Sequence, residues 1–256
     1  MNKTTKRGVV GMFECELKDI GLLRNAMEPV IELIDEAPIK IAEDGLRIMA
    51  SDRAVVAVVN LFLDKKMFVK YKLDAPLEIG VNLVNFSQIL KRAASDDKLV
   101  MKAEKETLQL IFIGKSERTF TLPIISISSE DTPPIDKLQF SNIIKLKSKI
   151  IIDAINDADL VSDSLVFSAT EKELKMSSSR DTTSMQSIVP KSQLEKLDIK
   201  EPCRSRFSLD YLKKIIKASK VAEDLEIALG TDYPMKMIFD AKHAHMEFIL
   251  APRVEE

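Results

Sequence analysis

Tryptophan is absent from this chain of 256 residues, which contains only seven glycines and two cysteines. Cys15 and Cys203 lie far apart and fit neither a zinc-ligand nor a CxxC spacing, so a disulfide scaffold is excluded and a reducing compartment is favoured. No apolar run approaches the roughly 20 residues that cross a bilayer, and no signal segment is present. We therefore expect an intracellular protein without a membrane partner.

Motifs of the common catalytic folds are missing too. The chain has no GxxxxGK(S/T), GxGxxG or GxSxG segment, which removes the usual nucleotide-binding and hydrolase signatures. His243 and His245 are spaced to lie on one face of a strand and could be two metal ligands, but no cysteine or third histidine accompanies them. The pairs Glu43-Asp44 and Glu130-Asp131 stand in turn-like stretches. We expect neither an enzyme nor a cofactor.

What the chain does contain is an ordinary globular composition, with 45% hydrophobic and 30% charged residues. Its length fits one large domain or two of about 100 to 150 residues. The net charge is −2, from 38 basic and 40 acidic residues. An even spread of these charges would argue against nucleic-acid binding. The distribution of charge along the chain therefore decides whether a nucleic-acid partner is expected.

A long, weak repeat divides the chain. LRIMAS (46–51) matches LKMSSS (174–179), NFSQILKRA (85–93) matches YLKKIIKAS (211–219), and LQLIF (108–112) matches MKMIF (235–239). The three offsets are 128, 126 and 127 residues, in the same order along the chain. We interpret this as two copies of one domain.

Each copy shows a short strand, a helix with apolar residues three and four apart, strands of period two, a second helix and further strands. The short connections predict antiparallel sheets and an α+β fold. We expect a flexible basic extension at 1–11, a first domain at 12–121, an interdomain connector at 122–139 around Pro133-Pro134, and a second domain with a C-terminal tail at 140–256. Pro29 falls inside the first helix, which should kink there or end early.

Basic residues gather on one face of the second helix of each copy. Lys213, Lys214, Lys217 and Lys220 lie opposite an apolar face, with only Asp210 interrupting them, and Lys91 and Arg92 occur at the matching place in the first copy. The first helices add Arg24 and Lys149, which nearby acidic residues dilute. Lysines also commonly cover any exposed helix face, but their recurrence favours contact with phosphate backbones, independent of base sequence.

Two segments are predicted to be uncovered sheet edges. SERTFTL (116–122) closes the first copy and DTTSMQSIV (181–189) lies in the second; both favour strands and carry little charge. Pairing of one edge with the other edge of a neighbouring chain would make a ring or a fibre. The residues expected at this subunit interface are Thr119, Phe120, Thr121, Thr183, Met185 and Ser187.

Four segments resemble one known family. MFECELKD from Met12, EDGLRIMASDRAVVAV (43–58), LEIGVNLVNFSQILKRA (77–93) and HMEFILAPRVEE (245–256) are similar to the archaeal and eukaryotic sliding clamps of the proliferating cell nuclear antigen type. The resemblance runs from about Met12 to the C-terminus. It implies a homotrimeric ring of six similar domains that encircles double-stranded DNA, with helices lining the hole and sheets outside.

The resemblance also implies site residues and partners. Duplex DNA would face Arg24, Lys91, Arg92, Lys149, Lys213, Lys214, Lys217 and Lys220. A groove for PIP-box peptides of DNA polymerase, clamp loader, flap endonuclease and DNA ligase would be lined by Ser51, Val56, Val58, Ile135, Pro234, Ile249, Ala251 and Pro252. The expected location is cytoplasmic and nucleoid-associated, or nuclear in a eukaryote. Two other hypotheses stay open: a tandem-domain adaptor that never encircles DNA, and a subunit of a heterotrimeric clamp that does not close on its own.

Overall fold

The structure is a computed structural model that describes residues 12–127 and 135–253. The predicted extension at 1–11 and the connector's Pro133-Pro134 lie outside the described residues. No helix among those described is long and apolar enough to cross a membrane.

The first half contains nine strands, two α-helices and one short 3₁₀ helix. In chain order they are β1 (Phe13–Leu17), α1 (Gly21–Ile31), β2 (Glu36–Ala42), β3 (Gly45–Ser51), β4 (Ala57–Asp64), η1 (Lys65–Met67), β5 (Lys70–Leu73), β6 (Leu77–Asn82), α2 (Leu83–Leu90), β7 (Lys98–Glu104), β8 (Thr107–Ile113) and β9 (Glu117–Pro123).

The second half, which follows the 3₁₀ turn η2 (Ile135–Lys137), repeats this order. Its elements are β10 (Asn142–Lys147), α3 (Ser148–Asp159), β11 (Ser164–Ala169), β12 (Glu173–Arg180), β13 (Thr183–Pro190), η3 (Lys191–Gln193), β14 (Lys196–Asp198), β15 (Cys203–Ser208), α4 (Leu209–Ile215), η4 (Ile216–Lys220), β16 (Asp224–Leu229), β17 (Met235–Ala241) and β18 (Ala244–Leu250). The duplication and the antiparallel α+β class predicted from the sequence are confirmed.

The sheets show the same duplication. Each half makes a five-strand unit, β5-β1-β7-β8-β9 or β14-β10-β16-β17-β18, and a four-strand unit, β4-β3-β2-β6 or β13-β12-β11-β15. Antiparallel pairing of β18 with β4, from Ala244↔Leu63 to Leu250↔Ala57, fuses the five-strand unit of the second half to the four-strand unit of the first. One nine-stranded sheet therefore crosses the junction between the halves.

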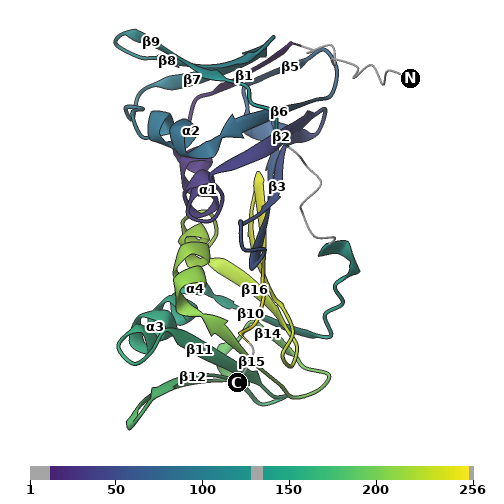
Figure 1. The fold of residues 1–256 in the computed structure, drawn as a ribbon, viewed down its shortest axis with the longest axis vertical. Helices are drawn as coiled ribbons and strands as arrows, with labels where there is room; N and C mark the ends of the chain where they lie inside the picture. The colour runs from purple at the N-terminus through teal and green to yellow at the C-terminus, as the bar shows by residue number, and fades with distance from the viewer. Residues whose placement is uncertain (1–11, 128–134, 254–256) are drawn as a thin grey trace, which may run out of the picture.

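The four helices form a second layer on one side of the sheets (Figure 1). Their order along the layer is α2, α1, α4 with η4, and α3, and α1 packs against η4 at the junction. Each helix turns an apolar face to the sheets, for example Leu23, Met27 and Val30 of α1. The side chain of Asn82 caps α2 by accepting the Asn85 backbone N–H. α1 runs two residues beyond Pro29, so this proline does not end the helix at once.

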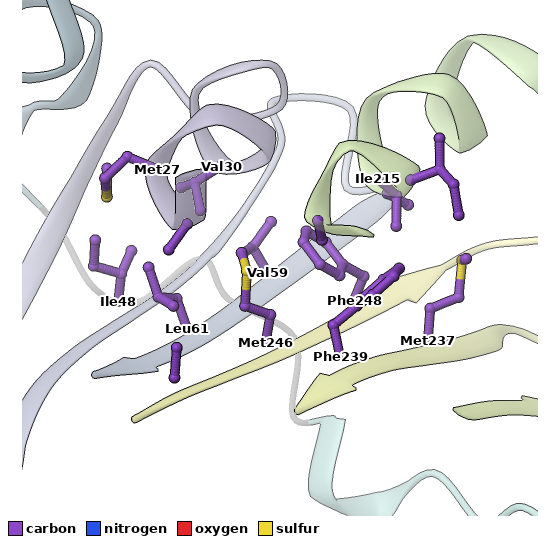
Figure 2. Close-up of a cluster of buried hydrophobic side chains, with 14 of the residues drawn as sticks. Met27, Val30, Ile48, Val59, Leu61, Ile215, Met237, Phe239, Met246 and Phe248 are labelled. Atoms are coloured by element: carbon purple, nitrogen blue, oxygen red, sulfur yellow. The ribbon is translucent and has the colours of Figure 1, made fainter. Parts of the chain in front are cut away.

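The core between the layers is continuous through the junction (Figure 2). Met27 and Val30 of α1 lie over Ile48 and Leu61, and Ile215 of α4 lies near Phe239 and Phe248. The rings of Phe239 and Phe248 meet edge to face, with centroids 6.1 Å apart. The two halves thus share one hydrophobic core.

Two predicted boundaries shift slightly. β9 continues to Pro123, so Leu122 and Pro123 belong to a strand and not to the connector. α4 ends at Ile215, and Lys217 and Lys220 lie in the 3₁₀ helix η4 that follows it. Both lysines pair there with carboxylates from the α1 side of the junction.

Candidate functional site

The predicted basic residues lie in the helix layer. Arg24 belongs to α1, Lys149 to α3, Lys213 and Lys214 to α4, and Lys217 and Lys220 to η4, whereas Lys91 and Arg92 follow α2 directly. All are exposed or partly exposed in this chain.

The expectation that only Asp210 interrupts the lysines of the second half is wrong. Lys217 Nζ lies 2.5 Å from Glu32 Oε1, and Lys220 Nζ lies 2.6 Å from Glu28 Oε2. Glu28 and Glu32 come from the α1 side of the junction. The remaining pairs are Lys213 with Asp159, Lys149 with Asp153, and Lys214 with Asp210. The sequence pattern of a single helix shows Asp153 and Asp210 but not Glu28, Glu32 or Asp159, because these three pair with lysines of a neighbouring helix.

The helix layer is therefore only weakly cationic. Its eight predicted basic residues are accompanied by six acidic ones, so it carries a net charge of +2 in a chain whose total is −2. Among the described residues, Arg24, Lys91 and Arg92 have no carboxylate partner within ion-pair distance. The acidic residues of the layer are Glu28, Glu32, Asp153, Asp157, Asp159 and Asp210.

The two predicted edges are edges in the structure. Within the described ranges, β9 pairs only with β8, and β13 only with β12. Their repeat equivalents are β18 and β4, the two strands that pair with each other at the junction within the chain. The two open edges thus correspond to the two strands that pair with each other inside the chain.

Hydrogen-bond alternation tells which backbone groups face the open sides. The Ile124 N–H donates to Glu106 O, so even-numbered residues of β9 point their backbone groups to β8, while Thr119 and Thr121 point theirs outward. On β13 the odd-numbered residues point their backbone groups to β12, because the Lys191 N–H donates to Lys172 O. The even-numbered residues of β13 therefore point theirs outward.

This alternation divides the residues expected at the interface by the direction of their backbone groups. The backbone groups of Thr183, Met185 and Ser187 point to β12, and those of Phe120 point to β8. The groups facing outward on β13 belong to Ser184, Gln186 and Ile188, which the sequence pattern did not identify. Pro123 and Pro190 end the two edges at positions whose missing N–H would have faced outward.

Two of the residues expected at the interface, Phe120 and Met185, have side chains that pack against the core of their own chain. Phe120 and Met185 are half-buried on the core side of their strands. The Phe120 ring meets Phe112 edge to face at 5.8 Å. Both strands therefore carry an apolar side chain at an edge that this chain covers only in part.

A small apolar groove of about 170 Å³ lies between the loop after β3, the connector and the C-terminal strand. Six of the eight predicted groove residues line it, namely Val56, Val58, Ile135, Pro234, Ile249 and Ala251. Ser51 and Pro252 flank it without lining it. Val55 and Leu138 also line it and were not predicted. Another space of about 30 Å³, enclosed by core residues such as Met27 and Phe86, is apolar and has room for about one water molecule.

The groove floor is a separate apolar cluster of Val58, Ile135 and Ile249. The C-terminal segment is held beside it by backbone hydrogen bonds, from Ala251 N to Val56 O at 2.8 Å and from Arg253 N to Arg206 O at 2.7 Å. The Arg253 guanidinium lies 2.9 Å from Asp163 and holds the pKa of that carboxyl below its usual value. The tail is thus fixed along one wall.

Asp52 organises the opposite wall. It is 9% exposed, and its carboxylate accepts the backbone N–H groups of Ala54, Val56 and Ala57 at 3.2, 2.7 and 2.7 Å. Burial alone would raise the pKa of Asp52, but these hydrogen bonds and one from Tyr211 outweigh it and lower the pKa.

The two histidines considered as metal ligands lie at and just before β18. His243 lies in the turn before β18, and His245 in β18 contacts Asp240. In the described part of the chain, no three His, Cys, Asp or Glu residues are grouped to hold a metal ion. Both cysteines are free and buried, and burial raises the pKa of each thiol, which disfavours the reactive thiolate.

Comparison with known proteins gives a consistent result. Residues 12–131 match the family model described as proliferating cell nuclear antigen, N-terminal domain, and residues 134–254 match the corresponding C-terminal domain. The DNA polymerase sliding clamp of Methanothermobacter thermautotrophicus is 32% identical over 249 residues, which are 95% of this chain and 99% of that protein. The clamp of Thermococcus gammatolerans is 35% identical over 228 residues, covering 88% and 91%.

Two solved structures share the fold. A PCNA2-PCNA3 complex from Sulfolobus tokodaii superposes with a TM-score of 0.85 at 26% identity, and PCNA from Thermococcus kodakaraensis with 0.85 at 25%. Each match covers 94% of this chain and the whole of the other chain.

Proposed function

This chain belongs to the proliferating cell nuclear antigen family and is a DNA polymerase sliding clamp, a processivity factor without enzymatic activity, and from this premise we propose that three copies close into a ring around duplex DNA. The observation that carries the proposal is the repeated joint: β18 pairs with β4 inside the chain, and their equivalents β9 and β13 are left open. Pairing of β9 with β13 of the next copy would repeat the same geometry at every boundary.

Identical subunits fit this arrangement well. The outward backbone groups of Thr119 and Thr121 find partners in those of Ser184, Gln186 and Ile188. The open ends of the helix layer also carry opposite charges, with Lys91 and Arg92 after α2, and Asp153 and Asp157 on α3. Opposite charges at the two ends favour association of one copy with another.

The helix layer would face the DNA. Arg24, Lys91 and Arg92 are the cations best able to approach phosphates, since the other five predicted residues already have carboxylate partners. A closed ring is held by its topology, so weak and exchangeable phosphate contacts suit sliding.

The apolar groove would receive PIP-box peptides of DNA polymerase, clamp loader, flap endonuclease and DNA ligase. Its small apolar floor fits one or two aromatic anchors, which supply most of the binding energy in such interfaces. We place the protein with the DNA it serves, in the cytoplasm of a cell without a nucleus or in the nucleus of a eukaryote.

Retention on DNA tests the ring directly. The protein is loaded on nicked circular DNA with ATP and the clamp loader of a related archaeon, then separated by gel filtration before and after a restriction enzyme linearises the DNA. We expect retention on the circle and loss of nearly all of it from the linear form. Equal retention on both would mean that the protein binds without encircling.

Light scattering of the chain alone separates the remaining candidates. The PCNA2-PCNA3 complex contains two different clamp subunits, which makes a mixed ring the second candidate for this chain. A trimer supports three identical copies. A monomer or dimer that is retained on circular DNA only with other subunits would favour the mixed ring, and an adaptor would not be retained at all.

A further inference from the structure

A hydrogen bond connects the helix layer of the second domain with the groove wall of the first. The Tyr211 hydroxyl, on α4, donates to Asp52 Oδ2 at 2.7 Å across 159 positions of sequence. Tyr211 does not line the groove, and its side chain is partly buried against the hydrophobic core. The role that we assign to this bond depends on the peptide-binding function proposed above.

The wall that Asp52 holds contains a strained residue. Val55 has a backbone φ of +55°, in the left-handed region that β-branched residues avoid, and its side chain is 51% exposed at the groove. Such a conformation costs about 1 to 3 kcal/mol and persists only where its surroundings fix it. Here Asp52 fixes the residues on both sides of Val55 by accepting the N–H groups of Ala54 and Val56.

Asp52 is itself fixed by Tyr211. The hydroxyl bonds to Oδ2, the oxygen that also accepts the Ala54 N–H, whereas Oδ1 takes Val56 and Ala57. Tyr211 is steadied in turn by Lys214, whose Nζ lies 5.4 Å from the ring centroid and 2.8 Å from Asp210 Oδ2. The chain of contacts runs from α4 to the tip of the groove wall.

The second copy of the domain does not repeat this pair of side chains. In the repeat, Asn85 stands at the place of Tyr211 and Arg180 at the place of Asp52, so the side-chain link has no counterpart there, although a positive φ of +51° recurs at Asp181 in the second domain's loop. A link needed merely for packing of the duplicated fold would be expected in both halves. We infer that the Tyr211 hydroxyl is a positioning group for the peptide groove, holding Asp52 so that Val55 and Val56 form its wall before a peptide arrives.

The inference predicts that Tyr211→Phe binds peptide more weakly. This variant keeps the ring and its packing but removes the donor to Oδ2, so the wall is free to leave the strained conformation. A groove that must be rebuilt on binding has lower apparent affinity. Tyr71→Phe is the matched control, since the Tyr71 hydroxyl donates to Ala42 O and Gly45 O within the first domain and lines no part of the groove.

The probe is a fluorescein-labelled synthetic peptide carrying a PIP-box motif with two aromatic anchors, titrated by anisotropy against full-length protein. We expect Kd to rise about 5- to 20-fold for Tyr211→Phe and less than about twofold for Tyr71→Phe, which corresponds to loss of one hydrogen bond to a charged group. Hydrogen exchange should speed up at the amides of Val56 and Ala57 in Tyr211→Phe alone, with trimer mass unchanged by light scattering.

The outcomes separate the two proposals. Failure of the wild-type protein to bind the peptide would remove the groove function itself. Binding by the wild type with an unchanged Kd in Tyr211→Phe would overturn the positioning role alone, as would an equal loss in both tyrosine variants or a loss that follows dissociation of the trimer.

Discussion

At the scale of single residues, the groove depends on side chains that stand behind its surface. Asp52, Tyr211 and Arg253 do not line it, yet they hold the two segments that do. Asp52 bears most of this task, because one buried carboxylate satisfies three backbone N–H groups that would otherwise lack partners.

The lowered pKa of Asp52 predicts how Asp52→Asn should behave. The carboxylate form stabilises the fold, so its contribution is complete above the unfolded pKa of about 4 and is lost as pH falls through the lower folded pKa. At neutral pH we expect the variant to be less stable by about 1 to 3 kcal/mol. The difference should be constant above about pH 5 and shrink as the solution is acidified.

Urea denaturation between pH 3 and pH 8, at one protein concentration, measures this difference. Asp96→Asn is the control, since Asp96 is exposed and should show little difference at any pH. A gap between wild type and Asp52→Asn that widens in acid would contradict the assignment of Asp52 as the ionised acceptor.

At the scale of elements, the edge strands differ from ordinary strands in having one unused side. β9 and β13 present outward N–H and C=O groups at Thr119, Thr121, Ser184, Gln186 and Ile188, and each ends in a proline that stops pairing from continuing. Free edges are a hazard for aggregation unless a defined partner covers them.

Thr119→Pro tests the partner. Proline removes an N–H that no strand of the same chain uses, and its ring occupies space that an approaching strand needs. We expect the variant to keep its circular dichroism spectrum while the subunit dissociation constant rises at least about tenfold. Sedimentation velocity over a dilution series measures the dissociation, and Thr119→Val, which keeps the N–H, should remain a trimer. A trimeric Thr119→Pro would rule out pairing through β9.

Helices and strands were predicted from the sequence more accurately than contacts between distant residues. The repeat at LRIMAS and LKMSSS identified β3 and β12, and the β-prone, weakly charged segments identified both edges, because local pattern carries this information. Which residues of β13 point their backbone groups outward could not be predicted, since this depends on the register of β13 with β12. The partners of Lys217 and Lys220 were missed for a similar reason: Glu32 and Glu28 lie more than 180 positions away and meet them only after packing.

The strain at Val55 gave no signal in the sequence either. Valine is among the residues least expected at positive φ, so a turn propensity would not have placed it there. The Asp52 network fixes the neighbours of Val55, and one of its four hydrogen bonds comes from the other domain.

At the scale of the whole molecule, the charge of the helix layer fits the weak contact with DNA that we propose. The helix layer has a net charge of +2 against −2 for the chain, and the ion pairs at the junction neutralise Lys217 and Lys220. Exposed pairs of this kind contribute only about 0 to 1 kcal/mol to stability, so they can be removed without unfolding the protein.

Glu28→Gln combined with Glu32→Gln should therefore change DNA binding more than stability. Freeing two lysines should tighten binding to a 30-base-pair duplex several-fold at low salt and steepen the slope of log K against log salt by up to about 0.9 per lysine. Fluorescence anisotropy at several salt concentrations measures both quantities. Glu104→Gln with Glu106→Gln, in the β7–β8 hairpin, is the control of equal charge change. An unchanged slope in the first variant would place Lys217 and Lys220 away from the DNA.

The nine-stranded sheet has a mechanical consequence. Seven residue pairs join β18 to β4, and a shared core lies beneath them, so the two domains of one chain behave as a single stiff arc. In a ring of such copies, a gap wide enough to admit DNA would have to open at an interface between two copies. It would not open between the two domains of one copy.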